Sequence, residues 1–95
     1  MAGYVIADVD VHDREAYDEY RKLVAPTIEK YGGRFVVRAG AHEVMEGDWT
    51  PHRVIVLEFE SVARAKEWYG SEEYAPALAI RLKAATSSMI IVEGA

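Results

Sequence analysis

The stretch RVIVLEFE at residues 53–60 is the most informative segment of this chain. Its centre, from Val54 to Leu57, is apolar without alternation, which is typical of a β-strand that is buried on both faces. A second stretch of this kind, SMIIVE at residues 88–93, lies near the end of the chain. We therefore expect a β-sheet in which both faces are covered.

Two more strands are predicted closer to the N-terminus. Residues 3–11, GYVIADVDV, are rich in Val and Ile and alternate between two faces, and residues 34–39, RFVVRA, form a shorter strand. Residues 40–52 then make a long connection to the strand at 53–60. Connections of this length within a small domain are often functional.

Two helical segments alternate with these strands. Apolar residues recur at steps of three and four in both segments, as they do in amphipathic helices. The first segment is predicted to begin at the N-cap Asp13, to kink at Pro26 and to end at Gly32–Gly33. The second is predicted to begin at the N-cap Ser61 and to break at Gly70–Ser71, where Ser71 caps a new turn.

The resulting order β-α-β-β-α-β is that of the ferredoxin-like α+β fold. It predicts a four-stranded antiparallel sheet with two helices on one face, and it places the third strand between the first and the second. Ninety-five residues suffice for one domain only, so the domain spans residues 1–95.

The second face of this sheet has to be covered as well. The segments VIVL and MIIV place apolar side chains on both faces, and an exposed apolar patch of that kind marks an interaction surface. We expect a homodimer that packs sheet on sheet and so forms a dimeric α/β barrel. The alternative is a monomer in which residues 40–52 fold over the open face.

Composition excludes several classes of protein. The net charge of −5 argues against a nucleic-acid partner, and the absence of Cys excludes disulfides and thiolate zinc sites. No apolar run is long enough for a membrane span, and the N-terminus lacks the pattern of a signal peptide. We therefore expect a cytoplasmic protein without a membrane partner.

Charged residues inside the strands are the first candidates for a site. Asp8, Arg38 and Glu58 lie on three neighbouring predicted strands, and simple alternation places Arg38 on the same face as Arg34. A guanidinium matches a carboxylate in bidentate fashion, so Arg38 could anchor a small organic acid while Glu58 acts as a base. The alternative is a structural ion-pair network.

The long connection and the aromatic residues supply further candidates. His42 could move a proton, Trp49 and Arg53 could line a pocket, and Tyr69 and Tyr74 flank the helix break. Arg81 follows Tyr74 at a spacing that places both on nearly one helix face, and we interpret it as a surface residue. The spacing of His and acidic residues does not match a metal motif.

Several segments in order resemble one bacterial family. These are GYVIADVDV, KYGGRFVVRAG, EVMEGDW, VIVLEFES and WYGSEEYAPALAIRLKAA. Together they resemble the family DUF1330 of the dimeric α/β-barrel superfamily, over nearly the whole chain. The resemblance implies ferredoxin-like subunits paired into a barrel. It implies no activity, because superfamily members range from cofactor-free monooxygenases to stress-response proteins.

Two functions follow as hypotheses. The first is a homodimer that binds a small organic or anionic ligand, without a metal or cofactor. The alternative is a cofactor-independent enzyme that transfers protons or oxygenates a small organic acid or aromatic compound. The candidate catalytic residues are Glu58 and His42, and the candidate ligand-binding residues are Arg38, Trp49, Arg53, Tyr69 and Tyr74.

Overall fold

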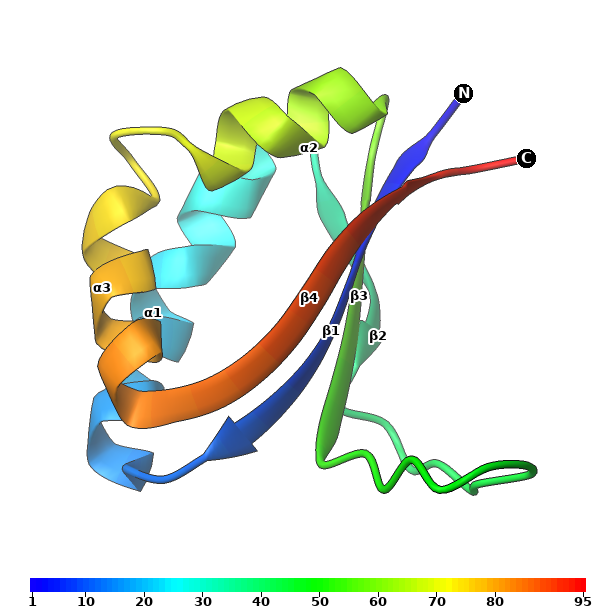
Figure 1. Cartoon of the computed structure of the whole chain (residues 1–95). Helices are drawn as coiled ribbons and strands as arrows, with labels where there is room; N and C mark the ends of the chain where they lie inside the picture. The colour runs from blue at the N-terminus through cyan, green and yellow to red at the C-terminus, as the bar shows by residue number, and fades with distance from the viewer.

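Four antiparallel strands form one sheet, and helices cover one of its faces (Figure 1). The computed structural model describes the whole chain, residues 1–95. The elements are β1 (Gly3–Val11), α1 (Arg14–Lys30), β2 (Arg34–Arg38), β3 (Arg53–Phe59), α2 (Val62–Tyr69), α3 (Ala75–Ala84) and β4 (Ala85–Glu93). The strand order β2-β3-β1-β4 confirms that the third strand lies between the first and the second.

Alternation along β1 separates the two faces of the sheet. Val5, Ala7 and Val9 are buried beneath the helices, whereas the residues between them lie on the open face. The core is rich in aromatic rings: Trp68 packs with its ring centroid 4.2 Å from that of Tyr74, and both side chains are almost completely buried. The buried cluster fills the space between the sheet and the helices.

The helix ends follow the predicted capping pattern. The side chain of Asp13 accepts a hydrogen bond from the Ala16 amide (3.2 Å), and α1 then runs through Pro26 to Lys30. Gly32 has a φ of 75°, in the left-handed region that ends helices. The second helical region is divided at Gly70, as predicted, but α3 begins at Ala75 rather than directly after Ser71.

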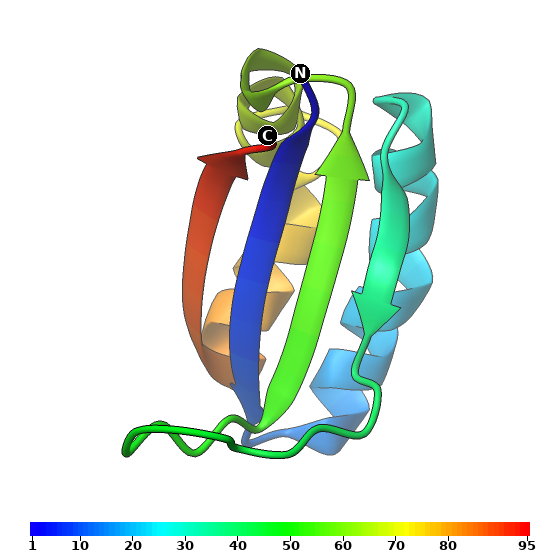
Figure 2. The same ribbon diagram turned by 90° about the vertical axis from the view of Figure 1, so that its right-hand side faces the viewer.

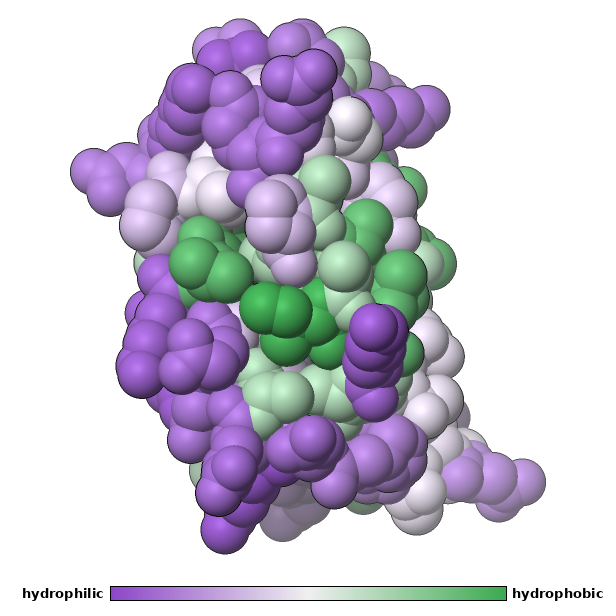
Figure 3. Space-filling model, turned by 90° about the vertical axis from the view of Figure 1, so that its left-hand side faces the viewer, coloured by the Kyte–Doolittle hydropathy of each residue, from purple (hydrophilic) through white to green (hydrophobic).

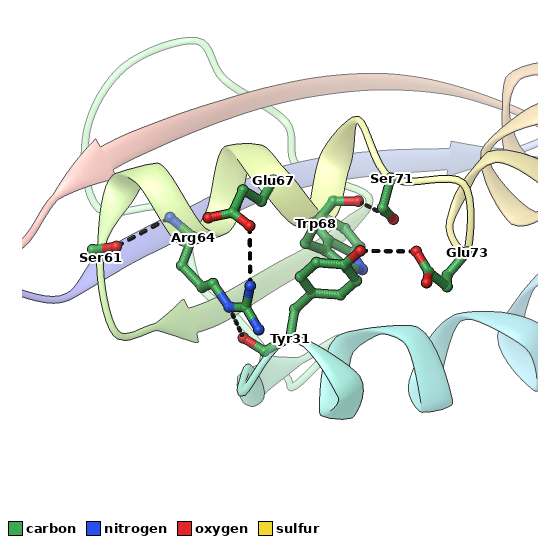
Figure 4. A network of polar contacts seen from close by, with 7 residues as sticks. All are labelled: Tyr31, Ser61, Arg64, Glu67, Trp68, Ser71 and Glu73. Atoms are coloured by element: carbon green, nitrogen blue, oxygen red, sulfur yellow. Dashed lines mark hydrogen bonds and ion pairs between the residues drawn. The ribbon is translucent and has the colours of Figure 1, made fainter.

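A polar network ties the end of α1 to α2 and to the turn that follows it (Figure 4). The Arg64 Nε donates to the Tyr31 carbonyl oxygen (3.2 Å), and the Tyr31 hydroxyl donates to the Glu73 carboxylate (2.8 Å). Lys30 pairs with the same carboxylate. These contacts tie α2 and the turn before α3 to the end of α1.

A β-bulge interrupts β2. Arg34 lies opposite Glu58 and Phe35 opposite Leu57, but the register then shifts, so that Arg38 lies opposite Ile55. The extra residue reverses the side on which the following side chain points. The predicted placement of Arg38 on the face of Arg34 is therefore wrong. Arg38 turns toward the helices, where its guanidinium carbon lies 4.1 Å from the centroid of the Phe35 ring.

The second face of the sheet is uncovered (Figure 2). The register places Val37, Val56, Ile6 and Ile90 in one apolar row across the strands, and Ile90 and nearby Val92 are well exposed. The connection between β2 and β3 runs across the ends of the strands, and its Trp49 lines a shallow hollow on this face together with Ile6 and Ile90. It is tied to the sheet through Asp8, which accepts hydrogen bonds from the Trp49 indole (3.0 Å) and the His52 amide (2.8 Å).

The outer surface of the helix layer is mixed. Figure 3 shows hydrophobic side chains gathered at its centre within a hydrophilic surround, and Leu23 of α1 and Leu82 of α3 are the exposed large apolar residues there. None of the helices combines the length and the hydropathy that a membrane crossing requires.

Candidate functional site: a cationic cavity between sheet and helices

A cavity of about 40 Å³ lies between the inner face of the sheet and the helices. Since a water molecule needs roughly 10–15 Å³ of such space, the cavity has room for about three waters. Twelve of its 16 lining residues are hydrophobic, and the other four are arginines. The chain has seven arginines and 16 acidic residues, yet four of the arginines and none of the acids line this cavity.

Arg81 of α3 is the most deeply buried of the four. Only 3% of the residue is exposed, and it forms no ion pair with a carboxylate. Its Nε donates a long hydrogen bond (3.4 Å) to the Tyr74 hydroxyl. Burial lowers the pKa of Arg81, but the neighbouring tyrosines, chiefly Tyr74, together outweigh burial and raise it, so the side chain stays charged. A buried charge without a counter-ion is unfavourable.

Two tyrosines extend this contact into a chain of polar groups. The Tyr74 hydroxyl lies 3.0 Å from that of Tyr20, and Tyr20 lines the cavity. Burial and the neighbouring Tyr74 raise the pKa of Tyr20 well above its ordinary value. Tyr20 therefore stays a neutral phenol that can donate a hydrogen bond.

Arg53, the first residue of β3, supplies a second incompletely satisfied cation. Its guanidinium carbon lies 5.3 Å from the centroid of the Tyr17 ring, while its Nε is buried without a hydrogen-bond partner. The Ser87 hydroxyl on β4 is also buried and unpartnered. Arg53 and Ser87 flank Val9 in one row of the sheet. Buried polar atoms without partners are rare in folded proteins and indicate a site for water or an ion.

The cavity opens toward the N-terminal half of α1. A wider hollow of about 700 Å³ there shares Val9, Tyr17, Arg21 and Arg53 with the cavity. Arg21 is exposed at this end and lies 3.8 Å from the Asp18 carboxylate, and exposed Arg38 lines a neighbouring hollow together with Arg21 and Asp18. The site is thus an apolar chamber with two buried or half-buried cations inside and two exposed cations at its entrance.

Some of the predicted candidate residues line this cavity, and the others lie elsewhere in the structure. Arg38 and Arg53 line the cavity, and Tyr74 lies behind it through Tyr20. Tyr69 is partly exposed and packs against Trp68 and Tyr74.

The predicted proton-transfer residues lie away from the cavity. Glu58 is on the open face, where it accepts hydrogen bonds from Arg34 (2.8 Å) and Tyr4 (3.2 Å). Asp8 lies on the same face without joining that network, and hydrogen bonds from His52 and Trp49 outweigh desolvation and lower its pKa. His42 is exposed in the connection between β2 and β3, together with Trp49. The structure shows no group of His and acidic residues that could hold a metal ion.

Arg81 is the residue that sequence reasoning misplaced. It is buried rather than on the surface. A signal was present, because Tyr74, Ala77, Arg81 and Ala84 recur at steps of three and four and form the buried face of α3.

Comparison with solved structures shows the fold. A protein of unknown function from Rhodopseudomonas palustris is 23% identical, with a TM-score of 0.78 over 99% of this chain and 82% of that chain. SnoaB, a cofactor-independent oxygenase from Streptomyces nogalater, is 11% identical, with a TM-score of 0.67 over 99% and 93%. A dimeric, ferredoxin-like protein of unknown function from Bacteroides fragilis is 12% identical, with a TM-score of 0.64 over 98% and 96%.

The sequence comparisons identify the family of the chain but no curated relative. A search of curated proteins gave no match. The profile of one family, described as a domain of unknown function, matches residues 2–95 and therefore nearly the whole chain. Together with the ferredoxin-like fold described above, this match shows that the chain belongs to the DUF1330 family.

Proposed function

We propose that this protein binds a small organic anion in the cationic cavity and works as a homodimer. The main support for this proposal is the burial of an unpaired charge: Arg81 is charged, 97% buried and without a carboxylate partner. A bound carboxylate would supply the missing counter-charge. The unpartnered Nε of Arg53 supports the same conclusion.

The surroundings favour an organic anion over a simple inorganic one. A guanidinium binds a carboxylate through two parallel hydrogen bonds, and such bonds strengthen where water is excluded. The hydrophobic residues that make up most of the lining provide that environment and offer contacts to a carbon skeleton. The guanidinium of Arg53 is stacked on Tyr17, which leaves the N–H groups at its edge free to bind.

The homodimer is proposed to form through the open face of the sheet. Ile90 is 58% exposed there, in a row that also includes half-buried Val37, Val56 and Ile6. Pairing with a second copy would bury these side chains, and the similar protein from Bacteroides fragilis is described as dimeric. The cavity lies on the other side of the sheet and stays accessible in such a dimer.

An enzymatic function has less support. The residues that we predicted to move protons, Glu58 and His42, lie on the open face and in the exposed connection. The cavity itself holds cations and phenols but no carboxylate or imidazole. A cofactor-independent enzyme therefore stays a hypothesis, and ligand binding is the function that the geometry supports best.

Thermal unfolding tests the proposal. Protein refolded from guanidinium, and so freed of bound molecules, is titrated with acetate, butyrate or benzoate at constant ionic strength. At ten times Kd a ligand adds about 1.4 kcal/mol to the free energy of unfolding, which raises the Tm by roughly 5–10 °C in a domain of this size.

Two variants make the test specific. Arg81→Gln should abolish the shift in Tm, whereas Arg64→Gln, which removes a surface arginine outside the cavity, should retain it. Equal shifts in wild type and Arg81→Gln, or no shift with any anion, would contradict the proposal.

A further inference from the structure

We propose that the ligand is a short dicarboxylate, with one carboxylate held inside the cavity and the other at its entrance. This inference rests on the proposed function and names the class of ligand. It follows from the way in which the four arginines are distributed over the cavity.

The arginines form an inner and an outer group. The inner group is Arg81 and Arg53, of which the first is almost fully buried and the second has a buried, unpartnered Nε. The outer group is Arg38 and Arg21, both exposed. A monocarboxylate on the inner group leaves the outer group without a partner, whereas a dicarboxylate can satisfy both.

The β-bulge in β2 brings the two groups together. Arg38 lies opposite Ile55, and Arg53 is two residues from Ile55 on the same face of β3. Diagonal neighbours of this kind have Cα atoms roughly 7–8 Å apart. Without the bulge, Arg38 would point to the open face beside Arg34. Bulges often re-aim a side chain toward a site in this way.

The outer group carries an uncompensated charge. Asp18 is the acidic residue among the side chains at the entrance, and its carboxylate lies 3.8 Å from Arg21. Arg38 has no ion pair, and the ring of Phe35 is its contact. The guanidinium of Arg38 is therefore free to bind a second carboxylate at the point where a ligand would emerge.

The inner group has a neutral donor beside it. The Tyr74 hydroxyl accepts from Arg81, so its own proton can be donated to Tyr20. When Tyr74 donates to Tyr20, the hydroxyl proton of Tyr20 has no protein acceptor. The Tyr20 hydroxyl can then donate a hydrogen bond to a carboxylate oxygen. Two guanidinium groups and one phenol then surround the inner carboxylate.

Matched pairs of acids with equal numbers of carbons test this inference. Calorimetric titration of refolded protein, at pH 7.5 and constant ionic strength, compares propionate with malonate, butyrate with succinate and valerate with glutarate. We expect at least one dicarboxylate to bind about fivefold or more tighter than its monocarboxylate, which corresponds to one partly exposed charge pair.

Arg38→Gln should weaken binding of the dicarboxylate more than binding of the monocarboxylate and so remove this preference, and Arg38→Lys should restore part of it. Arg34→Gln is the matched control, because Arg34 lies on the same strand but on the other face, and it should keep the full preference.

The outcomes separate the two proposals. If monocarboxylates bind as tightly as dicarboxylates, or if Arg38→Gln keeps the preference, the dicarboxylate inference is overturned while the anion site stands. If no acid of either kind binds, the anion site is overturned and this inference falls with it.

Discussion

Replacement of Arg81 by methionine should make the ligand-free protein more stable while it abolishes anion binding. Met has an unbranched side chain of similar length, so it can follow the path of the arginine stem without a charge. The buried guanidinium has no carboxylate partner to lose. Arg81→Met therefore removes an unfavourable buried charge and little else.

The expected change in the free energy of unfolding follows from the contacts of Arg81. Its hydrogen bond to Tyr74 is long, at 3.4 Å, and Tyr74 keeps its contact with Tyr20 at 3.0 Å. The loss of such a bond destabilises by about 0.5 kcal/mol. Apolar replacement of buried ionic groups often stabilises by roughly 1–4 kcal/mol. We expect a net gain of about 1–2 kcal/mol and a Tm higher by roughly 5–15 °C.

Guanidinium unfolding, followed by tryptophan fluorescence, measures this change. Trp68 is almost fully buried in the core and reports on global unfolding. Wild type and variant are first unfolded and refolded to remove bound anions, and are compared at one protein concentration because a dimer's stability depends on it. Arg64→Met is the control: it removes hydrogen bonds to Tyr31 and Glu67 and should be neutral or mildly destabilising.

A large loss of stability in Arg81→Met would contradict this expectation. If Arg81→Met lowers the free energy of unfolding by more than about 1 kcal/mol, then Arg81 stabilises the fold, and its burial would no longer indicate a ligand.

Three further predictions concern other parts of the molecule. Ile90→Asp should convert the proposed homodimer to a monomer in sedimentation at micromolar concentration. A dimer that survives this change would rule out the open face as the interface. The hydrogen bond from Lys30, with a second from a neighbouring phenol, lowers the pKa of Glu73 to about 2. The stability that the ionised Glu73 carboxylate contributes is present above its ordinary pKa near 4.5 and is lost as the pH falls toward 2. Glu73→Gln should therefore flatten the fall in Tm between pH 5 and pH 2. An unchanged slope of Tm against pH would contradict this prediction. Asp8→Asn should weaken the attachment of the connection between β2 and β3 to the sheet. We expect faster proteolysis of this connection and altered Trp49 fluorescence. Equal proteolysis rates in variant and wild type would show that other contacts hold the connection.

The architecture was predictable because it depends on patterns that are local. The two-sided apolar strands, the alternation in β1 and the caps at Asp13 and Ser61 each depend on a few neighbouring residues, and the structure confirms the order of elements and of strands. The unbroken run of apolar residues in β3 also indicated an open apolar face. The cytoplasmic location and the absence of a nucleic-acid partner stay predictions from composition.

The cavity was only partly predictable, because it depends on register and packing between distant segments. Arg38 and Arg53 were named as ligand-binding candidates, but strict alternation placed Arg38 on the wrong face, since a bulge is a property of two paired strands. Arg81 was interpreted as a surface residue because a cation on a helix usually faces water. Its position beneath the aromatic cluster depends on how α3 packs against α1 and the sheet.

A crystal structure of the refolded protein grown with succinate would show directly whether the cavity binds an anion. We expect a carboxylate within hydrogen-bonding distance of the guanidinium groups of Arg81 and Arg53. This expectation would be contradicted by a cavity that holds only water at saturating succinate, with Arg81 still bonded to Tyr74 alone.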